Sequence, residues 1–146
     1  MFVATMLERK GRDIITVSAQ STLSQAISVL TERGIGAVVV LDDDGSLAGI
    51  LSERDIIQRL AKHGADAMEM KVDDCMTRNV ITCREDDSVN GIMTMMNNGR
   101  FRHMPVVDKD NKMVGLISVG DVVKNRMEEV MRDTEDMKRY IVEGHF

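Results

Sequence analysis

The sequence has little of several features that would point directly to a partner or a compartment. Its net charge is −5 and no basic run rises above this acidic background, so nucleic acid or an anionic membrane is not the expected main partner. No apolar stretch approaches the length of a membrane span, and the opening MFVATMLERKGRD is too briefly apolar for a signal peptide. Cys75 and Cys83 are too few for a disulfide framework and are expected to be reduced. These absences predict a cytoplasmic protein.

Motifs of catalysis and of metal binding are also missing. The chain has no Gly-x-Ser-x-Gly elbow, no P-loop and no paired acid–base constellation, so we expect no enzyme. Cys75, Cys83 and His103 lack metal-ligand spacing, which argues against a structural metal. Gly34-x-Gly36 is half of a dinucleotide fingerprint, but it leads into a predicted strand and lacks the third glycine.

The chain does contain an internal repeat. GILSERD, residues 49–55, returns as GLISVGD, residues 115–121, and the offset of 66 holds without a gap from residues 12–55 to residues 78–121. Nine of these 44 aligned positions are identical, and the apolar positions between them also match. Because pattern, turns and motifs coincide, the two segments are interpreted as a duplication.

Each copy predicts the same order of elements: strand, helix, strand, strand, helix. Short apolar stretches at 14–17 and 80–83 are predicted strands, and 21–34 and 88–99 have helical spacing, with Asn97, Asn98 and Gly99 suited to a helix end. Two β-branched runs, turns rich in Asp, Gly, Asn and Lys, and return strands then predict hairpins at 37–52 and 104–118. After Ser52 and Ser118 the period becomes helical again.

Three capping patterns mark the starts of predicted helices. Thr22 with Gln25, Ser52 with Asp55, and Ser118 with Asp121 each have the spacing of a capping box. A helix start at a sheet edge is also a place where phosphate can bind, with a carboxylate one turn in for ribose hydroxyls. Capping alone does less to explain the glycine three residues before each serine, which leaves the ligand-binding interpretation open beside it.

One half of about 45 residues would expose an apolar sheet face, whereas two halves can bury both faces. The predicted fold is therefore α/β (α+β), with two β-α-β-β-α repeats packed sheet to sheet about a pseudo-twofold axis. We place repeat 1 with an N-terminal segment at 1–66, repeat 2 at 67–126 and a helical extension at 127–146. In the connection, Gly64 would end a helix, and Asp73 and Asp74 would cap the next element.

The helical extension carries apolar residues in a coiled-coil-like 4-3 spacing. They are Val123, Met127, Val130, Thr134, Met137 and Ile141. The stripe is short, and it could serve as an interface or fold back over its own module.

The β-α-β-β-α order, the duplication and the GILSERD/GLISVGD pair together resemble a pair of cystathionine β-synthase (CBS) domains, a Bateman module. RHMPVVD followed by MVGLISVGD is especially similar to the family pattern. The resemblance covers residues 7–126 and leaves no catalytic domain, which implies a stand-alone module. It also implies a homodimer of CBS pairs, flat and disc-like, in which Met93 or Met95 on the first helix of repeat 2 faces the partner chain. The simpler alternative is that most of the 13 methionines fill an irregular core.

The resemblance further implies a nucleotide site between the repeats. Ser52 and Ser118 would contact phosphate or ribose, Asp55 and Asp121 ribose hydroxyls, and Arg102 and His103 phosphate, unless Arg102 is only a solvated charge and His103 a half-buried histidine. Strand contacts and apolar walls for the base would come from Thr16, Thr82, Ala37, Val38, Met104 and Pro105.

The function implied by the resemblance is that of a regulatory, energy-sensing module binding an adenine nucleotide. AMP is the first expectation, with ADP, ATP and NAD(H) behind it. The main alternative is a ligand-free module that dimerises and regulates a partner enzyme or transporter.

Overall fold

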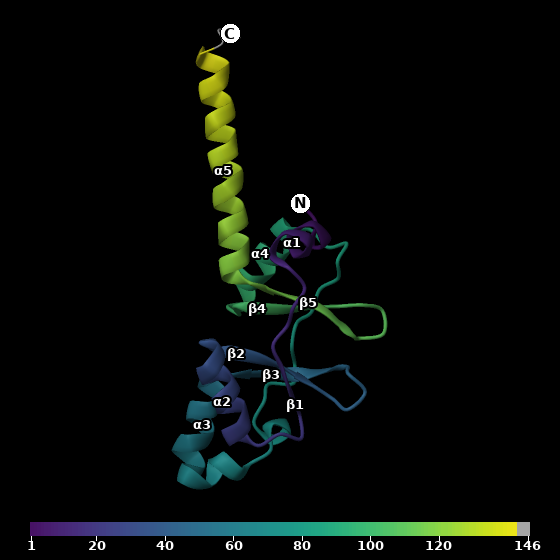
Figure 1. The fold of residues 1–146 in the computed structure, drawn as a ribbon, viewed down its shortest axis with the longest axis vertical. Coiled ribbons are helices and arrows are strands. Elements are labelled where there is room, and N and C mark those ends of the chain that lie inside the picture. Colours follow the sequence, from purple (N-terminus) through teal and green to yellow (C-terminus); the bar gives the residue numbers. More distant parts are fainter. Residues whose placement is uncertain (143–146) are drawn as a thin grey trace.

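The computed structural model describes residues 1–142 and consists of two similar halves stacked along the long axis of the molecule (Figure 1). The first half contains β1 (Thr16–Ser18), α2 (Leu23–Arg33), β2 (Ala37–Leu41), β3 (Leu47–Ser52) and α3 (Glu53–His63). The second contains α4 (Val89–Gly99), β4 (His103–Val107), β5 (Met113–Ser118) and α5 (Val119–Val142). Helix α1 (Val3–Lys10) precedes the first half, and the 3-10 helices η1 (Gly64–Glu69) and η2 (Val72–Asp74) join the halves. The predicted mixed fold of two repeats is confirmed.

The two sheets have the same hairpin and register. In the first sheet, of order β1-β2-β3, β1 runs parallel to β2, and β2 pairs antiparallel with β3. The second sheet is the antiparallel pair β4-β5. Val40 pairs with Gly49, and their counterparts Val106 and Gly115 pair in the same way, so the offset of 66 holds in space. Figure 1 shows the sheets stacked on one another, with α2 and α3 on one outer side and α1 and α4 on the other.

The predicted strand at 80–83 is wrong. Only Cys83 pairs with β4, through a single parallel bridge to Val106, whereas β1 in the first half pairs over three residues. The physical reason is Pro105, which stands where the first repeat has Val39 and has no N–H to donate to a neighbouring strand. The residues before Cys83 are therefore not part of the sheet, and they form irregular chain.

Helix α2 begins and ends as its sequence predicts. Thr22 and Gln25 form the capping box, with the Gln25 N–H donating to the Thr22 hydroxyl at 3.2 Å and the Thr22 N–H donating to Gln25 Oε1 at 2.9 Å. Gly34 follows the helix with φ +63°. In α4 the corresponding left-handed residue is Arg100, with φ +55°. Gly99 is the last residue of the helix, and the Phe101 ring packs where a Gly99 side chain would lie.

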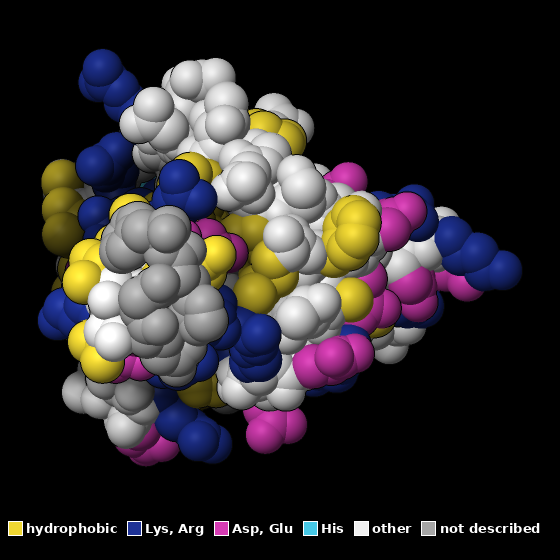
Figure 2. Space-filling view, turned by 90° about the horizontal axis from the view of Figure 1, so that it is seen from above, with side chains coloured by type: hydrophobic (Ala, Val, Ile, Leu, Met, Phe, Trp, Pro, Cys, Tyr) yellow, Lys and Arg dark blue, Asp and Glu magenta, His cyan; other side chains and the backbone are white. Residues whose placement is uncertain are grey.

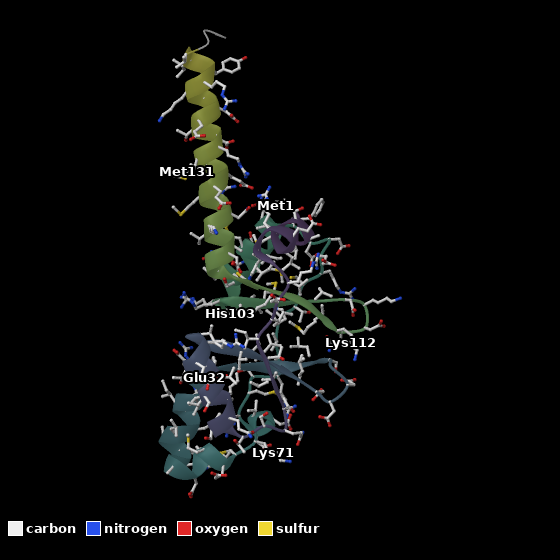
Figure 3. The ribbon with its side chains drawn as sticks, viewed as in Figure 1. Met1, Glu32, Lys71, His103, Lys112 and Met131 are labelled. Atoms are coloured by element: carbon white, nitrogen blue, oxygen red, sulfur yellow. The ribbon has the colours of Figure 1, made fainter. Side chains whose placement is uncertain are left out.

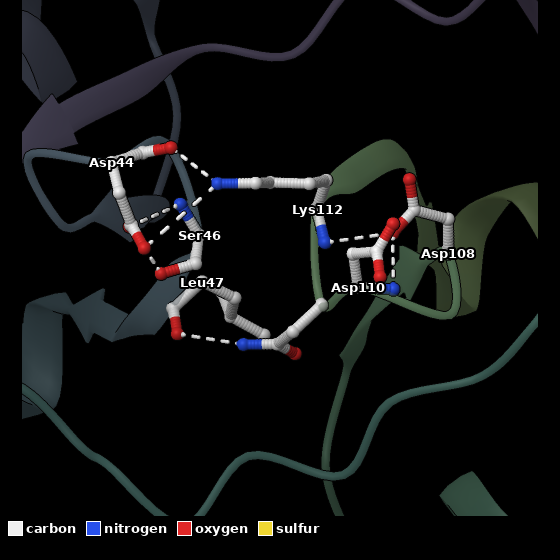
Figure 4. A network of polar contacts seen from close by, with 7 residues as sticks. Asp44, Ser46, Leu47, Asp108, Asp110 and Lys112 are labelled. Carbon is white, nitrogen blue, oxygen red and sulfur yellow. Dashed lines mark hydrogen bonds and ion pairs between the residues drawn. The ribbon is translucent and has the colours of Figure 1, made fainter.

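The two predicted hairpins are confirmed, and their turns touch each other (Figure 4). Gly45 and its counterpart Asn111 supply the positive φ that each turn requires, +82° and +61°. The Leu47 N–H donates to the Asn111 carbonyl at 3.2 Å, and the Lys112 ammonium donates to the Asp44 carbonyl oxygen. Repeat 1 is thus tied to repeat 2 at the hairpin ends.

The core is divided between the halves, and each part is completed by a segment that precedes the other half. Val3, Met6 and Leu7 of α1 precede repeat 1, yet they are buried in the core of repeat 2. Ala67 of η1 and Val72 of η2 come before the first helix of the second half, yet they are buried in the core of repeat 1. Residues 3–10 correspond to 69–76 at the offset of 66, so the exchange is reciprocal and follows the pseudo-twofold relation.

The glycine that both repeats keep before the serine is explained by this exchange. A methyl group on Gly49 would lie 2.5 Å from the Thr77 carbonyl oxygen and 2.9 Å from Met76 Sδ. One on Gly115 would lie 2.6 Å from Leu7 Cδ2. Both glycines therefore leave room for the crossing segment, which is a packing requirement and needs no ligand.

The predictions for the segments outside the two repeats are confirmed in part. Gly64 ends α3 as predicted. Asp73 and Asp74 do not cap a following helix, because they lie inside η2, and the Asp73 carboxylate pairs with Arg78 at 2.9 Å. Helix α5 is continuous from Val119 to Val142 and projects away from the module instead of folding back (Figure 1). The last part of the predicted extension, 143–146, lies outside the described residues.

No helix within residues 1–142 combines the length and apolar character needed to cross a membrane.

The crossing predicts unequal effects of three glycine-to-alanine changes. Gly49→Ala should lower the free energy of unfolding by about 1–3 kcal/mol, because its methyl group meets rigid backbone. Gly115→Ala should lower it less, since the Leu7 side chain that it meets can move. Urea denaturation of the three variants measures both. Gly120→Ala is the control, because its nearest contact would be an ordinary 3.6 Å and alanine favours a helix. A neutral Gly49→Ala would contradict this account of the crossing.

Candidate functional site

A cleft of about 690 Å³ opens between the repeats at the start of α3. Its volume is within the range of about 300–1,000 Å³ typical of small-molecule sites. His103, at the start of β4, lies at the boundary of the two halves (Figure 3). The cleft is lined by residues of both repeats: Gly36, Ala37, Ile50, Ser52, Glu53, Arg54, Asp55, Thr77, Asn79, Val80, Ile81, Gly99, Arg100, Phe101, Arg102 and His103.

The floor of the cleft is the N-terminus of α3, where the predicted capping box is confirmed. Asp55 Oδ2 accepts the Ser52 N–H at 2.9 Å and the Ser52 hydroxyl at 3.0 Å. The Asp55 N–H donates back to Ser52 Oγ at 3.3 Å. These contacts hold the carboxylate beside the positive end of the helix dipole, half-buried in the cleft wall.

The adjoining part of the cleft lining begins at Thr77. Its backbone exchanges two hydrogen bonds with Ile50, at 2.9 and 3.0 Å, and its hydroxyl donates to Asp55 Oδ1 at 3.1 Å. The residues that come next, Asn79 to Ile81, then line the cleft as irregular chain. The Ile81 side chain is 45% exposed, so it offers apolar surface to a ligand.

Three arginines face the cleft without partners of their own. Arg54, Arg100 and Arg102 line it, and within residues 1–142 none of their guanidinium groups makes an ion pair or hydrogen bond. Against these three positive charges stand the carboxylates of Glu53 and Asp55. The cleft can therefore receive an anion through charge-assisted hydrogen bonds that no intrachain group now makes.

His103 is a neutral side chain in this setting. Burial lowers the pKa of His103, and the positive charges of Arg102 and Lys10 lower it further, while Asp121 opposes them. At pH 7 the imidazole therefore offers one donor and one acceptor nitrogen and carries no positive charge for a phosphate.

The corresponding place in repeat 2 is occupied by the protein itself. Asp121 Oδ2 accepts the Ser118 N–H at 2.9 Å, as in repeat 1, but it also accepts the Lys10 ammonium at 2.5 Å. Lys10 donates in addition to the Leu116 carbonyl at 2.7 Å. Burial acts to raise the pKa of Asp121, yet the bonds from Lys10 and Ser118 outweigh it, so the pKa lies below its ordinary value. Gly11 stands where repeat 2 has Thr77.

The structure brings only some of the predicted site residues into the cleft. Ala37, Ser52, Asp55, Arg102 and His103 line it. The others do not line it: Thr16, Val38, Thr82, Met104, Pro105, Ser118 and Asp121.

Strand alternation explains the two predicted wall residues that are buried elsewhere. Val38 and Met104 follow Ala37 and His103, and successive strand side chains point to opposite faces. Val38 is therefore buried in the repeat 1 core and Met104 in the repeat 2 core.

Other lining residues were missed, because the segment after Thr77 was expected to enter a strand. Thr77 lines the cleft beside Asp55, and Asn79, Val80 and Ile81 continue the lining from there. A sequence signal existed in Pro105, which excludes a full parallel ladder beside β4. Phe101 was also missed, although it is one of only three phenylalanines and directly precedes Arg102.

Among the residues that the structure describes, no three His, Cys, Asp or Glu side chains converge as a metal site would require. The two thiols lie in the cores, and burial raises the pKa of Cys83 to about 12.

Comparison with protein families gives one match that covers both repeats. The model of the CBS domain matches residues 10–62 and 72–128. An uncharacterised protein of Methanopyrus kandleri is 31% identical over 88% of this chain, which spans 66% of that protein's length. The mitochondrial CBS domain-containing protein CBSX3 of Arabidopsis thaliana is 30% identical over 98% of this chain, which spans 73% of its length.

Solved structures with the same fold are CBS-domain proteins, and some of them are complexes with ligands. The CBS-domain containing protein ATU1752 of Agrobacterium tumefaciens is 42% identical, with a TM-score of 0.79 over 86% of this chain and 92% of its own. The CBS domain pair of protein MJ0100, in complex with 5-methylthioadenosine and S-adenosyl-L-methionine, is 26% identical, with a TM-score of 0.77 over 88% and 98%. CBSX2 in complex with AMP is 25% identical, with a TM-score of 0.69 over 79% and 88%.

The Lys10–Asp121 pair predicts a pH-dependent contribution to stability. Lys10→Met should lower the free energy of unfolding by about 0.5–1 kcal/mol at pH 7. Because the pKa of folded Asp121 is depressed, this contribution is present above the carboxyl group's unfolded pKa and is lost as pH falls through the folded pKa. Chemical denaturation of wild type and variant between pH 7 and pH 2 measures the difference. Lys109→Met, which removes an exposed hairpin lysine, is the control. A difference that stays constant into acid would contradict the ion pair's role.

Proposed function

The chain belongs to the CBS domain family, and on that premise we propose that it is a regulatory module whose ligand is an adenine nucleotide bound in the Asp55 cleft. AMP is the first candidate, and ADP, ATP and NAD(H) are the next. The module acts by sensing the nucleotide in the cytoplasm and passing the signal to a protein that it regulates, without catalysis of its own.

The observation that carries this proposal is that one cleft is lined both by the Asp55 carboxylate, which has hydrogen-bonding capacity left, and by arginines that make no ion pair within residues 1–142. Asp55 Oδ2 accepts the Ser52 N–H and hydroxyl, but among the residues that the structure describes only the Thr77 hydroxyl donates to Oδ1. Since a carboxylate oxygen can accept two hydrogen bonds, Oδ1 has room for one ribose hydroxyl. Binding of both hydroxyls, as the sequence analysis expected, would require Asp55 to release one of its present donors.

The phosphate of the nucleotide is assigned to the arginines. Arg100 and Arg102 flank Phe101 at the edge of the cleft, and Arg54 lies at the start of α3. A guanidinium matches a phosphate with two parallel N–H donors. The N–H groups at the start of α3 add the positive end of a helix dipole on the same side.

The base is assigned to the apolar part of the cleft, where Ala37, Ile50, Val80 and Ile81 meet. Related CBS domain pairs support an adenosine group there. Protein MJ0100 binds 5-methylthioadenosine and S-adenosyl-L-methionine, and CBSX2 binds AMP. Adenine on a ribose is the part that these three ligands share, whereas the groups attached to the 5′ carbon differ.

We propose one nucleotide per chain. Asp121 already receives a cation from within the chain, because Lys10 bonds both to its carboxylate and to the carbonyl of Leu116. Leu116 and Asp121 correspond to Ile50 and Asp55 of the open cleft, so a ligand in the second half-site would have to displace Lys10.

A second candidate function is favoured by exposed apolar side chains on the outer helices. Ile57 is 64% exposed, and Leu60, Met93 and Met95 are exposed as well. Such a surface suits contact with another CBS pair or a partner enzyme or transporter. In this alternative the protein is a homodimeric interaction module, and no regulatory ligand binds in its cleft.

Ligand binding predicts a stabilisation that can be measured. AMP at 100 times its Kd should raise the free energy of unfolding by about 2.7 kcal/mol, which corresponds to a rise in Tm of roughly 5–10 °C. Calorimetric titration should give one AMP per chain, and GMP and CMP should shift Tm less, because the apolar walls select the base. Equal shifts for all three nucleotides would indicate phosphate binding without base recognition, and no shift would favour the interaction module.

Substitution of the two equivalent carboxylates separates ligand binding from capping. Asp55→Asn should weaken AMP binding about ten- to a hundredfold, because a charge-assisted bond to ribose is lost. Asp121→Asn is the matched control: it alters the same capping box but should leave the Kd for AMP unchanged. Arg102→Ala should weaken AMP more than adenosine. Titration and melting curves of each variant give both quantities, and equal affinities for all variants with the fold intact would leave Asp55 a capping residue only.

A further inference from the structure

Helix α5 has a long apolar stripe that residues 1–142 leave exposed. Its 24 residues extend about 36 Å, and most of this length rises beyond the rest of the molecule (Figure 1). Val122 is its only buried residue within the described chain. Met127 is 59% exposed, Val130 55% and Met137 66%. Figure 2, seen from the side toward which α5 projects, shows hydrophobic side chains open to solvent among charged ones.

The stripe has the repeat of a coiled coil. Val123, Met127, Val130, Thr134, Met137 and Ile141 are separated by 4, 3, 4, 3 and 4 residues. The alternation of 4 and 3 repeats every seven residues, and two apolar positions per seven residues is the pattern of a left-handed two-helix seam, with positions d and a alternating from Val123 onward. Thr134 is the one polar member, and its hydroxyl donates to the Val130 carbonyl of the same helix at 2.9 Å, so it brings no unsatisfied donor into a seam.

We propose that α5 pairs with α5 of a second copy of this chain as a parallel, in-register coiled coil. In this pairing, position g of one helix lies beside position e of the next heptad of its partner. Asp133 occupies g and Lys138 occupies e, so each copy's Asp133 faces Lys138 of the other. Neither side chain makes an ion pair within residues 1–142, and both are exposed.

The antiparallel arrangement is disfavoured by the same charges. Aligning the whole stripe antiparallel places Val123 beside Ile141 and Val130 beside Thr134. In this arrangement the e positions of the two helices face each other, and so do the g positions. Lys124 of each copy, at e, then lies beside Lys138 of the other, and the two Asp133 side chains, at g, lie side by side. All of these contacts join like charges, which repel. Charge complementarity thus selects a second copy in the parallel orientation, and the pairing does not depend on the nucleotide.

Single cysteines in the seam test the orientation. In the full chain, Val130→Cys and Met137→Cys should each cross-link to themselves within minutes under a mild oxidant, because equivalent d positions face each other in a parallel pair. Arg132→Cys, at the outward position f, is the matched control and should cross-link at least tenfold more slowly. Cys75 and Cys83 are buried, and the unsubstituted chain treated in the same way sets the background.

Each other outcome of this experiment overturns the proposal. Preferential cross-linking between Val130→Cys and Thr134→Cys chains, with none between two Met137→Cys chains, would establish the antiparallel pairing. Cross-linking of Val130→Cys no faster than Arg132→Cys would show that α5 does not pair with itself. A melting curve for each variant confirms that the module is folded.

Charge reversal gives a second readout that does not use cysteine. Lys138→Asp should raise the dimer Kd about three- to tenfold, because it sets a carboxylate against Asp133 of the partner copy. Asp133→Lys should act similarly, and the double variant should restore the wild-type Kd. In an antiparallel pair Lys138→Asp would instead lower the Kd, since the introduced carboxylate would face Lys124. Glu135→Lys, at the outward position b, is the control for sedimentation. A lowered Kd, or no change in any variant, overturns the parallel pair.

Discussion

The exchange of segments between the repeats is the contact on which both the fold and the cleft depend. The chain before each repeat is buried in the core of the other, and Gly49 and Gly115 lack the side chains that would prevent this crossing. At the Gly49 crossing, Thr77 pairs with Ile50 through its backbone and with Asp55 through its hydroxyl. The residue that joins the repeats therefore also orients the carboxylate at the head of α3, so packing and binding geometry are built by one contact.

The duplication gives two equivalent positions, beside Asp55 and beside Asp121, and the residues around them differ. Repeat 2 has Arg102 and His103 where repeat 1 has Gly36 and Ala37. The positive charge of Arg102 therefore lines the Asp55 cleft. On the other side, Lys10 fills the place beside Asp121. The Asp55 cleft is thus open and lined by arginines, whereas Lys10 fills the equivalent place beside Asp121. This asymmetry is what the proposed binding of one anionic ligand per chain would require.

Local signals predicted the capping boxes and the hairpin turns, because each depends on residues a few positions apart. Ser52 and Asp55 bond to each other whatever surrounds them, and Asn111 supplies a positive φ as Gly45 does. The site was predicted less completely. Ala37 and Arg102 were predicted from the family resemblance and line the cleft, whereas Val38, predicted in the same way, is buried in the core because strand alternation turns it there.

The sequence by itself determined the duplication, the order of elements, the helix starts and the heptad stripe of α5, since all of these are periodicities or short-range pairs within one chain segment. Only the tertiary structure decided which segment completes which core, and that Lys10 reaches Asp121, 111 positions away. It also showed that the chain before Cys83 leaves the sheet and forms a wall of the cleft. These features arise from contacts between residues far apart in sequence. The packing of the two repeats sets the geometry of these contacts, and no local sequence pattern predicts it.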